Sequence, residues 1–392
     1  MTSEKPKILI ADDQDDILFA LEILLRSEGY APKTVQSPAA ALAILRTAKM
    51  DLFLMDLNYA RGPSTVREGI DLLSQVQKLD PLLPVVVMTG WASIDLAVET
   101  MHMGAVNFIQ KPWQNQKLLE MIRDQIERGR VRRREERLLA VGRIEIAEAE
   151  AVQRAFLPPS LPEMERVEMA ARWQPKGQVG GDYYDVFLLD SDRLGFCVAD
   201  AAGKGLPAAL LMSNLQAGLR SFASASSGPA EVVSRLNQLM CANHWINKFV
   251  TLFYGVLDLR KSALTYANAG HPPPVVRRAD GSRVLLKENG GIVGFFPDWT
   301  YGQDVLPLSS GDTLWLFTDG ILEARDPAGA EFGPTRLDRL LDEAGPESLA
   351  EGQERIWKAL LDFSAGVLED DAAMLALRLK APKPMEIPKA FY

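Results

Sequence analysis

The first third of the chain alternates short apolar runs with stretches whose apolar residues recur at helical spacing. Ile17–Glu28 and Ile94–Met103 have that spacing, and a glycine, Gly29 or Gly104, follows each as a helix stop. The apolar runs are typical of buried strands. Strands that alternate with helices predict a doubly wound parallel α/β sheet over residues 5–122. The predicted strands are Lys7–Ala11, Pro32–Val35, Asp51–Met55, Pro84–Met88 and Asn107–Gln110.

Residues 114–155 are rich in charge and contain no proline. The cluster Arg130–Arg137 is typical of a solvated helix face, and a nucleic-acid patch is the alternative. The spacing of the apolar residues predicts a long helical connector, interpreted as a coiled coil that joins two copies of the chain in a homodimer. Leu157–Pro162 ends it, because its prolines interrupt a helix. The apolar positions are Leu118, Ile122, Ile126, Leu138, Ile144 and Val152.

Beyond Pro162 the apolar runs are shorter, and some lie close together. Thr251–Leu259 and Ala263–Ala267 have the separation of a β-hairpin. Two helical stretches, Pro207–Ser224 and Ala230–Asn243, interrupt the runs. The mixture predicts an α+β layered domain. The expected organisation is a first domain at 1–122, a helical connector at 123–157, a second domain at 158–380 and a flexible tail at 381–392. Further predicted strands are Leu188–Leu189, Leu194–Ala199, Thr313–Phe317 and Met374–Leu379.

Composition narrows the function classes. The chain has 392 residues, 47% hydrophobic positions and a net charge of -9. This acidic balance argues against direct nucleic-acid binding, since a phosphate backbone would repel it. No apolar run approaches the roughly 18–20 residues of a membrane span, and the first residues lack the apolar core of a signal peptide. Two cysteines, Cys197 and Cys241, form no disulfide framework, so a reducing cytoplasm is expected.

Acidic residues follow several predicted strands of the first domain. Asp12 and Asp13, then Asp56, Thr89 and Lys111, each come directly after an apolar run. Because the carboxyl ends of parallel strands meet at one edge of a sheet, these side chains are expected to lie together. Gathered carboxylates repel one another, and an all-oxygen set suits Mg²⁺. The pattern therefore predicts a magnesium site with a lysine beside it.

The same positions resemble those of a response-regulator receiver domain, which has a flavodoxin-like fold. The resemblance implies that Asp12 and Asp13 bind the metal, that Asp56 is phosphorylated and also contacts the metal, and that a histidine kinase supplies the phosphoryl group. It further implies that Thr89 and Phe108 act with Lys111 as the switch, and that a cis peptide precedes Pro112. One departure is the longer segment at residues 58–68, which is either a surface excursion or a place where Arg61 or Arg67 tunes phosphoryl lifetime.

The later two thirds resemble the metal-dependent protein phosphatase (PPM) family, in its bacterial SpoIIE- or RsbU-like branch. The resemblance covers residues 147–380 and rests on several short segments in the family's order. Two segments depart from the usual pattern: Ala201-Ala202 replaces valine-serine, and Gly294-Phe295-Phe296 replaces Gly-x-x-Leu-Gly. The matching segments are Gly180–Asp185, Val198–Gly205, Thr251–Gly255, Asn268–His271, Phe317–Gly320 and Asp370-Asp371.

Family resemblance assigns these segments their roles. Asp200 resembles the carboxylate that bridges two Mn²⁺ or Mg²⁺ ions, with the carbonyl of Ala201 as a further ligand. Asp319 and Asp370 resemble terminal ligands, and Asp182 a ligand that acts directly or through water. Two ions so placed lower the pKa of a water for attack on phosphoserine or phosphothreonine.

Several nearby residues keep two interpretations. Asp185 and Asp371 are either outer partners of the site or turn residues. Arg172 and Lys176 are candidates for binding substrate phosphate. His271 is either a general acid or part of a structural turn, and the latter is favoured.

The expected function is a two-component output enzyme in which the receiver controls a serine/threonine phosphatase. The branch implies a phosphorylated STAS-type anti-sigma-factor antagonist as substrate. One alternative is an adaptor that captures a partner of a sigma-factor pathway without catalysis, but such members lack the acidic set, which this chain retains. A DNA-binding regulator is disfavoured by the acidic chain, which contains no recognition-helix module.

Overall fold

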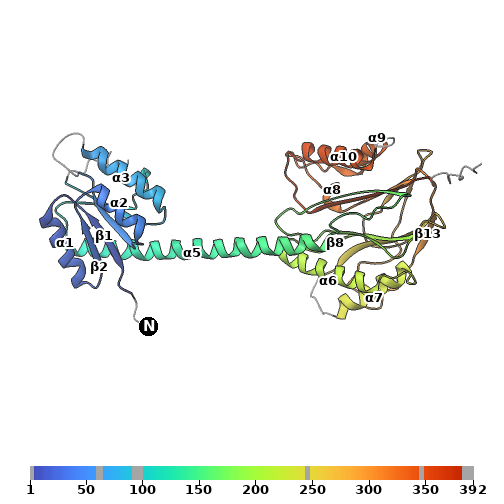
Figure 1. Cartoon of the computed structure of the whole chain (residues 1–392), viewed down its shortest axis with the longest axis horizontal. Coiled ribbons are helices and arrows are strands. Elements are labelled where there is room, and N and C mark those ends of the chain that lie inside the picture. Colours follow the sequence, from blue (N-terminus) through green and yellow to red (C-terminus); the bar gives the residue numbers. More distant parts are fainter. Residues whose placement is uncertain (1–3, 59–64, 91–99, 243–247, 344–347, 382–392) are drawn as a thin grey trace, which may run out of the picture. The chain divides into compact units, whose positions relative to one another are not determined.

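The computed structural model describes residues 4–58, 65–90, 100–242, 248–343 and 348–381 (Figure 1). It divides into two compact units, Met1–Arg143 and Ile144–Tyr392. Residues 59–64 of the longer segment at 58–68, nearly all of the tail at 381–392 and most of the predicted helix Ile94–Met103 lie outside the described residues. Among the described residues, no helix has the length and hydropathy that crossing a bilayer requires.

The first unit contains a five-stranded parallel sheet in the order β2-β1-β3-β4-β5. Alternate residues of the central strands face opposite sides, so Leu9 and Ile10 enter different cores. The helices that cover the sheet are α1 (Asp15–Ser27), α2 (Pro38–Thr47), α3 (Thr65–Leu79) and the start of α5. The prediction of a doubly wound parallel sheet is confirmed. The strands are β1 (Lys7–Ala11), β2 (Ala31–Val35), β3 (Leu52–Asp56), β4 (Val85–Thr89) and β5 (Asn107–Gln110).

Helix α5 is continuous from Asn115 to Phe156. Its first turns bury Leu118, Ile122 and Ile126 against the sheet of the first unit. The sequence pattern counted these three in the helical stretch at 114–155, and only Ile126 lay beyond the expected first domain at 1–122. All three belong to the core of the first unit. Further along, Arg133 binds the carboxylate of Asp80 at 2.7 Å. Leu138, Ile144 and Val152, further along, are exposed, and Leu138 is 63% accessible to solvent.

The second unit contains two five-stranded sheets, in the orders β13-β10-β9-β8-β7 and β12-β11-β14-β15-β6, and all their paired strands are antiparallel. The strands of the first sheet are β7 (Tyr183–Leu188), β8 (Arg193–Ala201), β9 (Val250–Asp258), β10 (Ala263–Ala269) and β13 (Asp304–Pro307). Those of the second are β6 (Val167–Gln174), β11 (Val275–Arg277), β12 (Arg283–Leu285), β14 (Thr313–Phe317) and β15 (Ala372–Leu379). The predicted α+β layered fold is confirmed.

Side-chain alternation makes this unit four layers thick. Phe196 of β8 and Leu375 of β15 face each other's sheets in a shared inner core. Cys197 and Ala199 face outward against α6 (Leu206–Phe222) and α7 (Pro229–Ala242). The other sheet is covered by helices that pack on residues such as Met374, and Figure 1 shows the two helical layers on opposite sides of the paired sheets. These helices are α8 (Asp319–Leu322), α9 (Gly333–Glu343) and α10 (Leu349–Phe363).

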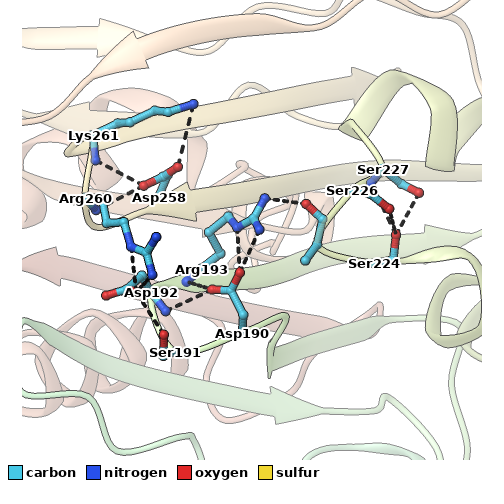
Figure 2. A network of polar contacts seen from close by, with 11 residues as sticks. Asp190, Ser191, Asp192, Arg193, Ser224, Ser226, Ser227, Asp258, Arg260 and Lys261 are labelled. Carbon is cyan, nitrogen blue, oxygen red and sulfur yellow. Dashed lines mark hydrogen bonds and ion pairs between the residues drawn. The ribbon is translucent and has the colours of Figure 1, made fainter.

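A polar network fixes the turn end of the first sheet (Figure 2). Asp190 accepts hydrogen bonds from the backbone and side chain of Arg193, which closes the turn between β7 and β8. Asp192 accepts a bond from Arg260 in the turn between β9 and β10. Ser262 completes that hairpin with a φ of 47°. Because Arg193 begins β8 and Ala201 ends it, this network holds the sheet at the end opposite to Asp200.

Candidate functional site

The first acidic cluster lies at the carboxyl edge of the parallel sheet. Asp12 follows β1, and Asp56 and Thr89 are the last residues of β3 and β4. Lys111 follows β5, and the peptide bond to Pro112 is cis. The Nζ atom of Lys111 donates hydrogen bonds to Asp12 Oδ2 at 2.6 Å and to Asp56 Oδ2 at 2.8 Å. Four strand ends therefore bring these residues together.

The charge of this cluster suits a divalent cation. Asp12, Asp13 and Asp56 each offer an oxygen, and these oxygens lie within 4.8 Å of one another. Burial raises the pKa of Asp12, although the hydrogen bond and positive charge of Lys111 oppose that shift. Three carboxylates facing one ammonium group leave negative charge that an oxygen-seeking ion such as Mg²⁺ would neutralise. Thr89 is buried, and Phe108 is 37% exposed.

The second acidic set lies where strands of both sheets end. Asp200 is near the end of β8, followed by Ala201, and Asp182 directly precedes β7. Asp319 begins α8 immediately after β14, and Asp370 lies just before β15. The two layers thus bring together the carboxylates that the family resemblance singled out. Burial, together with their negative charges, raises the pKa values of Asp182 and Asp200.

Burial raises the pKa of Asp182 well above its ordinary value, and the negative charges of Asp200 and Asp371 add to the effect. Burial also raises the pKa of Asp200 to about 7, with further contributions from the charges of Asp319 and Asp370. Burial likewise raises the pKa of Asp319, and the negative charge of Glu323 adds to that shift. Such mutual repulsion is the expected property of carboxylates placed to hold cations.

The four carboxylates of this set are spread more widely than those of the first. In the described part of the chain, only Asp12, Asp13 and Asp56 place three acidic oxygens within 4.8 Å of one another. Asp370 instead binds Lys204, whose Nζ lies 2.6 Å from Asp370 Oδ2. Lys204 also donates to the carbonyl of Glu369 at 3.0 Å. A hollow of about 260 Å³ adjoins this pair and is bordered by Lys176 and Glu323.

Buried polar contacts hold the loop that carries Asp182. Thr318 donates a hydrogen bond to Asp182 Oδ2 at 2.6 Å. Asp371 accepts bonds from the backbone N–H groups of Lys176 at 2.8 Å and Gly181 at 2.6 Å. A Cβ on Gly180 would lie 2.5 Å from the Asp371 carboxyl group, so only glycine fits there. Asp371 therefore positions the loop that carries Asp182, which favours its interpretation as an outer partner of the site.

Gln153, near the end of α5, forms hydrogen bonds with the same loop. Its Nε2 donates to the carbonyl of Gly180 at 2.5 Å, and its Oε1 accepts from the N–H of Gly180 at 3.0 Å. The side chain is 3% exposed, so both bonds are shielded from water. Sequence reasoning gave no role to Gln153, which lies in no motif, or to Thr318, although Thr318 lies in the matching segment Phe317–Gly320. Both act on a residue distant in sequence.

Other candidates are engaged elsewhere. Asp185 binds Arg220 through two hydrogen bonds, at 2.6 and 2.7 Å, and forms a structural ion pair between β7 and α6. Arg172 binds Glu354 and lies over the ring of Trp357. His271 is fully buried, and burial lowers its pKa to about 3, so it stays neutral near pH 7. Its Nδ1 lies 3.0 Å from the Thr251 hydroxyl, which supports the structural interpretation.

Comparisons with known proteins identify both units. Residues 8–123 match the model of the response regulator receiver domain, and residues 190–380 match that of Stage II sporulation protein E. Protein IcfG of a Synechocystis strain is 32% identical, over 60% of this chain and 42% of its own length. Phosphoserine phosphatase RsbU of Bacillus subtilis is 33% identical, over 60% of this chain and 70% of its own.

Among solved structures, the SiaA-PP2C domain of Pseudomonas aeruginosa is similar to this chain. It is 26% identical with a TM-score of 0.55, and the match covers 62% of this chain and 99% of that domain. This agrees with the layered fold of the second unit. The chain therefore belongs to the SpoIIE/RsbU family of PP2C-type phosphatase domains and carries a response regulator receiver domain at its N-terminus.

Proposed function

We propose that this protein is a two-component response regulator with phosphatase output. Phosphorylation of Asp56 by a histidine kinase would control a Mg²⁺- or Mn²⁺-dependent phosphoserine/phosphothreonine protein phosphatase. The substrate we propose is a phosphorylated STAS-type anti-sigma-factor antagonist, in the cytoplasm. The proposed boundaries are a receiver at 1–122, a connector at 123–157 and a phosphatase domain at 158–380. The single observation that carries the proposal is that Asp182, Asp200, Asp319 and Asp370 lie where strands of both sheets end, close enough for their negative charges to add to burial in raising the pKa values of the first three.

The donor set fits divalent ions of the magnesium type. Side chains of the four aspartates and the carbonyl of Ala201 offer only oxygen, which Mg²⁺ and Mn²⁺ prefer. A set that surrounds two ions would be wider than one around a single ion, in keeping with the spacing described above. Bound there, the ions would supply positive charge that activates water and neutralises the substrate phosphate.

The chain's own residues would prepare the site. Thr318 orients the carboxylate of Asp182, and Asp371 fixes the preceding loop through backbone N–H groups. Lys204 stands beside Asp370, with its ammonium group directed at the acidic set. There it would attract the phosphate dianion of a substrate and hold its oxygens while water attacks.

In the receiver, Asp56 would accept the phosphoryl group from a phosphohistidine. A carboxylate oxygen of Asp56 would form the new bond to phosphorus as the bond to the imidazole nitrogen breaks. Lys111, already 2.8 Å from Asp56, would hold the phosphoryl oxygens. Asp12 and Asp13, with Asp56, would hold the Mg²⁺ that balances the added charge. Thr89 and Phe108 would carry the change to the surface.

The direct test measures phosphate release from a phosphoserine protein or peptide, with Mn²⁺ present and absent, before and after treatment with acetyl phosphate. The proposal expects release that needs the ion and changes when Asp56 is phosphorylated. Absence of release at every Mn²⁺ concentration, together with binding of a partner protein, would favour the adaptor function instead.

Helix α5 is the proposed route between the two sites. It is fixed to the first unit by Arg133 and Asp80, and to the loop before Asp182 by Gln153. Replacing Gln153 by alanine removes both bonds to Gly180. We expect the ratio of phosphatase rates with and without phosphorylation to fall toward one. The reason is that the loop would lose about 1–3 kcal/mol of the free energy that holds it in position. Glu148→Ala, an exposed residue one to two turns before Gln153 on the same helix, is the matched control and should keep the ratio. An unchanged ratio in Gln153→Ala would exclude this route.

Stability should depend jointly on pH and on divalent ions. The pKa of Asp200 is raised to about 7 in the folded chain, above its ordinary value of 3.8. Its contribution to stability is therefore present below the ordinary pKa and is lost as pH rises through about 7. An ion that binds the charged form reverses this loss. We expect Mn²⁺ to raise the melting temperature of the second unit more at about pH 8 than at about pH 5.5.

Differential scanning calorimetry of the full chain, with Asp200→Asn as control, checks this dependence. The variant lacks the titrating carboxylate, so its response to Mn²⁺ should be smaller and should vary less with pH. Equal responses of the native chain at both pH values would contradict a site built on Asp200.

A further inference from the structure

Three large aromatic side chains lie half-exposed on one short segment of the second unit. Phe295, Phe296 and Trp299 are 46%, 48% and 45% exposed. Their rings are in contact: the centroids of Phe295 and Phe296 are 4.7 Å apart, and those of Phe296 and Trp299 are 5.6 Å apart. Single exposed apolar residues are common on proteins, but a contiguous group usually marks an interaction surface. We call these three residues the aromatic platform.

The platform is held in a fixed conformation. Asn237 of α7 is buried, accepts a hydrogen bond from the N–H of Gly294 at 2.8 Å and donates one to the carbonyl of Phe296 at 2.8 Å. Gly294 has a φ of 89°, which favours glycine and turns the chain outward. The platform is therefore a built feature rather than a loose loop that happens to expose its rings.

The platform is continuous with the acidic site. Val293, just before Gly294, exchanges two backbone hydrogen bonds with Val250, at 2.8 and 2.9 Å. Val250 is in turn the strand partner of Ala201, which follows Asp200. The ring of Phe249 meets Phe295 edge-on at 6.3 Å, and the carbonyl of Phe249 accepts a bond from the N–H of Ala202. One strand therefore separates the platform's backbone from that of the proposed metal ligand.

Charge and shape indicate the kind of occupant. Lys248 lies between the platform and the site, with its Nζ donating to the carbonyl of Ala202 at 3.2 Å. A hollow of about 650 Å³ opens beside Phe295, between Cys241 of α7 and Pro297. Asp298 borders this hollow, and with the net charge of -9 it disfavours an anionic membrane surface. A phosphoprotein fits both the hollow and the positive charge, because an apolar side chain could fill the hollow while its phosphate reaches Lys248 and Lys204.

We propose that the aromatic platform docks the phosphoprotein substrate by binding a large apolar side chain close in sequence to the phosphorylated residue. This inference rests on the proposed phosphatase function and assigns the determinant of its substrate choice. Aromatic residues at the centre of such contacts dominate binding, so losing one is expected to weaken binding about tenfold or more.

The test uses fluorescein-labelled phosphoserine peptides with an alanine background and one phenylalanine placed in turn at each neighbouring position. Fluorescence polarisation measures their binding to the full chain, and phosphate release is measured on the same peptides and on para-nitrophenyl phosphate. We expect one or two phenylalanine positions to increase affinity about tenfold or more, and Phe296→Ala to remove that increase. Para-nitrophenyl phosphate, too small to reach the platform, should be hydrolysed at the native rate by Phe296→Ala. Leu285→Ala, another exposed apolar residue of this unit, is the control.

The outcomes separate this inference from the proposed function. Equal affinity for all peptides, or an increase that survives in both Phe295→Ala and Phe296→Ala, would overturn the docking surface whether or not phosphate is released. A phenylalanine preference lost in the variants, without phosphate release by the native chain, would support the surface and overturn the phosphatase. Self-association or binding to phosphatidylcholine vesicles that is lost in Phe296→Ala, with no peptide preference, would also overturn it. Melting temperatures show that each variant is folded.

Discussion

Replacing Asp200 by alanine should reduce phosphatase turnover by about 10³-fold or more, because it would remove the carboxylate proposed to bridge two ions. Asp200 lies in a site where burial and neighbouring carboxylates already raise its pKa to about 7. Removing it relieves that repulsion. The melting temperature without added ions should therefore stay the same or rise, which separates lost chemistry from lost folding. The measurement is phosphate release from a phosphoserine peptide at saturating Mn²⁺.

Asp280→Ala is a suitable control for this experiment. Asp280 lies in an exposed turn of the same unit, where its carboxylate accepts local bonds from Ser282. We expect native turnover from this variant. Turnover within about threefold of native in Asp200→Ala would contradict the assigned role, since that change amounts to less than 1 kcal/mol of barrier.

Replacing Asp56 by asparagine should abolish phosphorylation of the receiver. The amide has nearly the same shape, but it lacks the negative charge and nucleophilic oxygen that attack phosphorus. Its neutral side chain would still accept a hydrogen bond from Lys111, so the fold of the first unit should persist. Incubation with radiolabelled acetyl phosphate measures the incorporated label. The native chain should be labelled, and Asp56→Asn should show only background.

A second acidic residue provides the control for the receiver. Asp71 lies exposed on α3, and Asp71→Asn should be labelled as the native chain is. With Asp56→Asn, acetyl phosphate should also cease to change the phosphatase rate. Retained labelling in Asp56→Asn would place phosphorylation on another residue and remove the proposed switch.

The geometry of the receiver site could be predicted well from sequence because a parallel sheet imposes it. Residues that end successive strands meet at one edge, so the positions of Asp12, Asp56, Thr89 and Lys111 followed from the apolar runs. The strands β3 and β4 are shifted by one residue from the predicted runs, so that Asp56 and Thr89 end them rather than follow them. Hydrophobicity alone does not locate the end of a strand when the last residue of the strand is polar.

The limits of the connector were harder to predict. Leu118, Ile122 and Ile126 have the same spacing whether a helix packs on a sheet or on another helix, and here they pack on the sheet. The helix α10 was also missed, although its signal was present. Ser348 and Glu351 form a capping box at its start, a pattern that marks a helix N-terminus in sequence.

The long-range polar contacts that hold the loop before Asp182 could not be predicted from the sequence. Gln153 meets Gly180, 27 positions away, and Thr318 meets Asp182, 136 positions away. Neither pair has a periodic or compositional signature, because each depends on how separate elements come together. The residues that position the loop before Asp182 are therefore visible only in the folded chain, whereas the family resemblance already pointed to the carboxylates themselves.

Anomalous scattering from manganese in crystals of the full chain tests the central claim most directly. Two peaks are predicted in the second unit, both within about 2.5 Å of an oxygen of Asp200, with Asp319 and Asp370 beside them. A third peak among Asp12, Asp13 and Asp56 would serve as an internal control for ion loading. If the third peak is present but no anomalous density appears at Asp200, the proposal that the second unit binds two ions through Asp200 is contradicted.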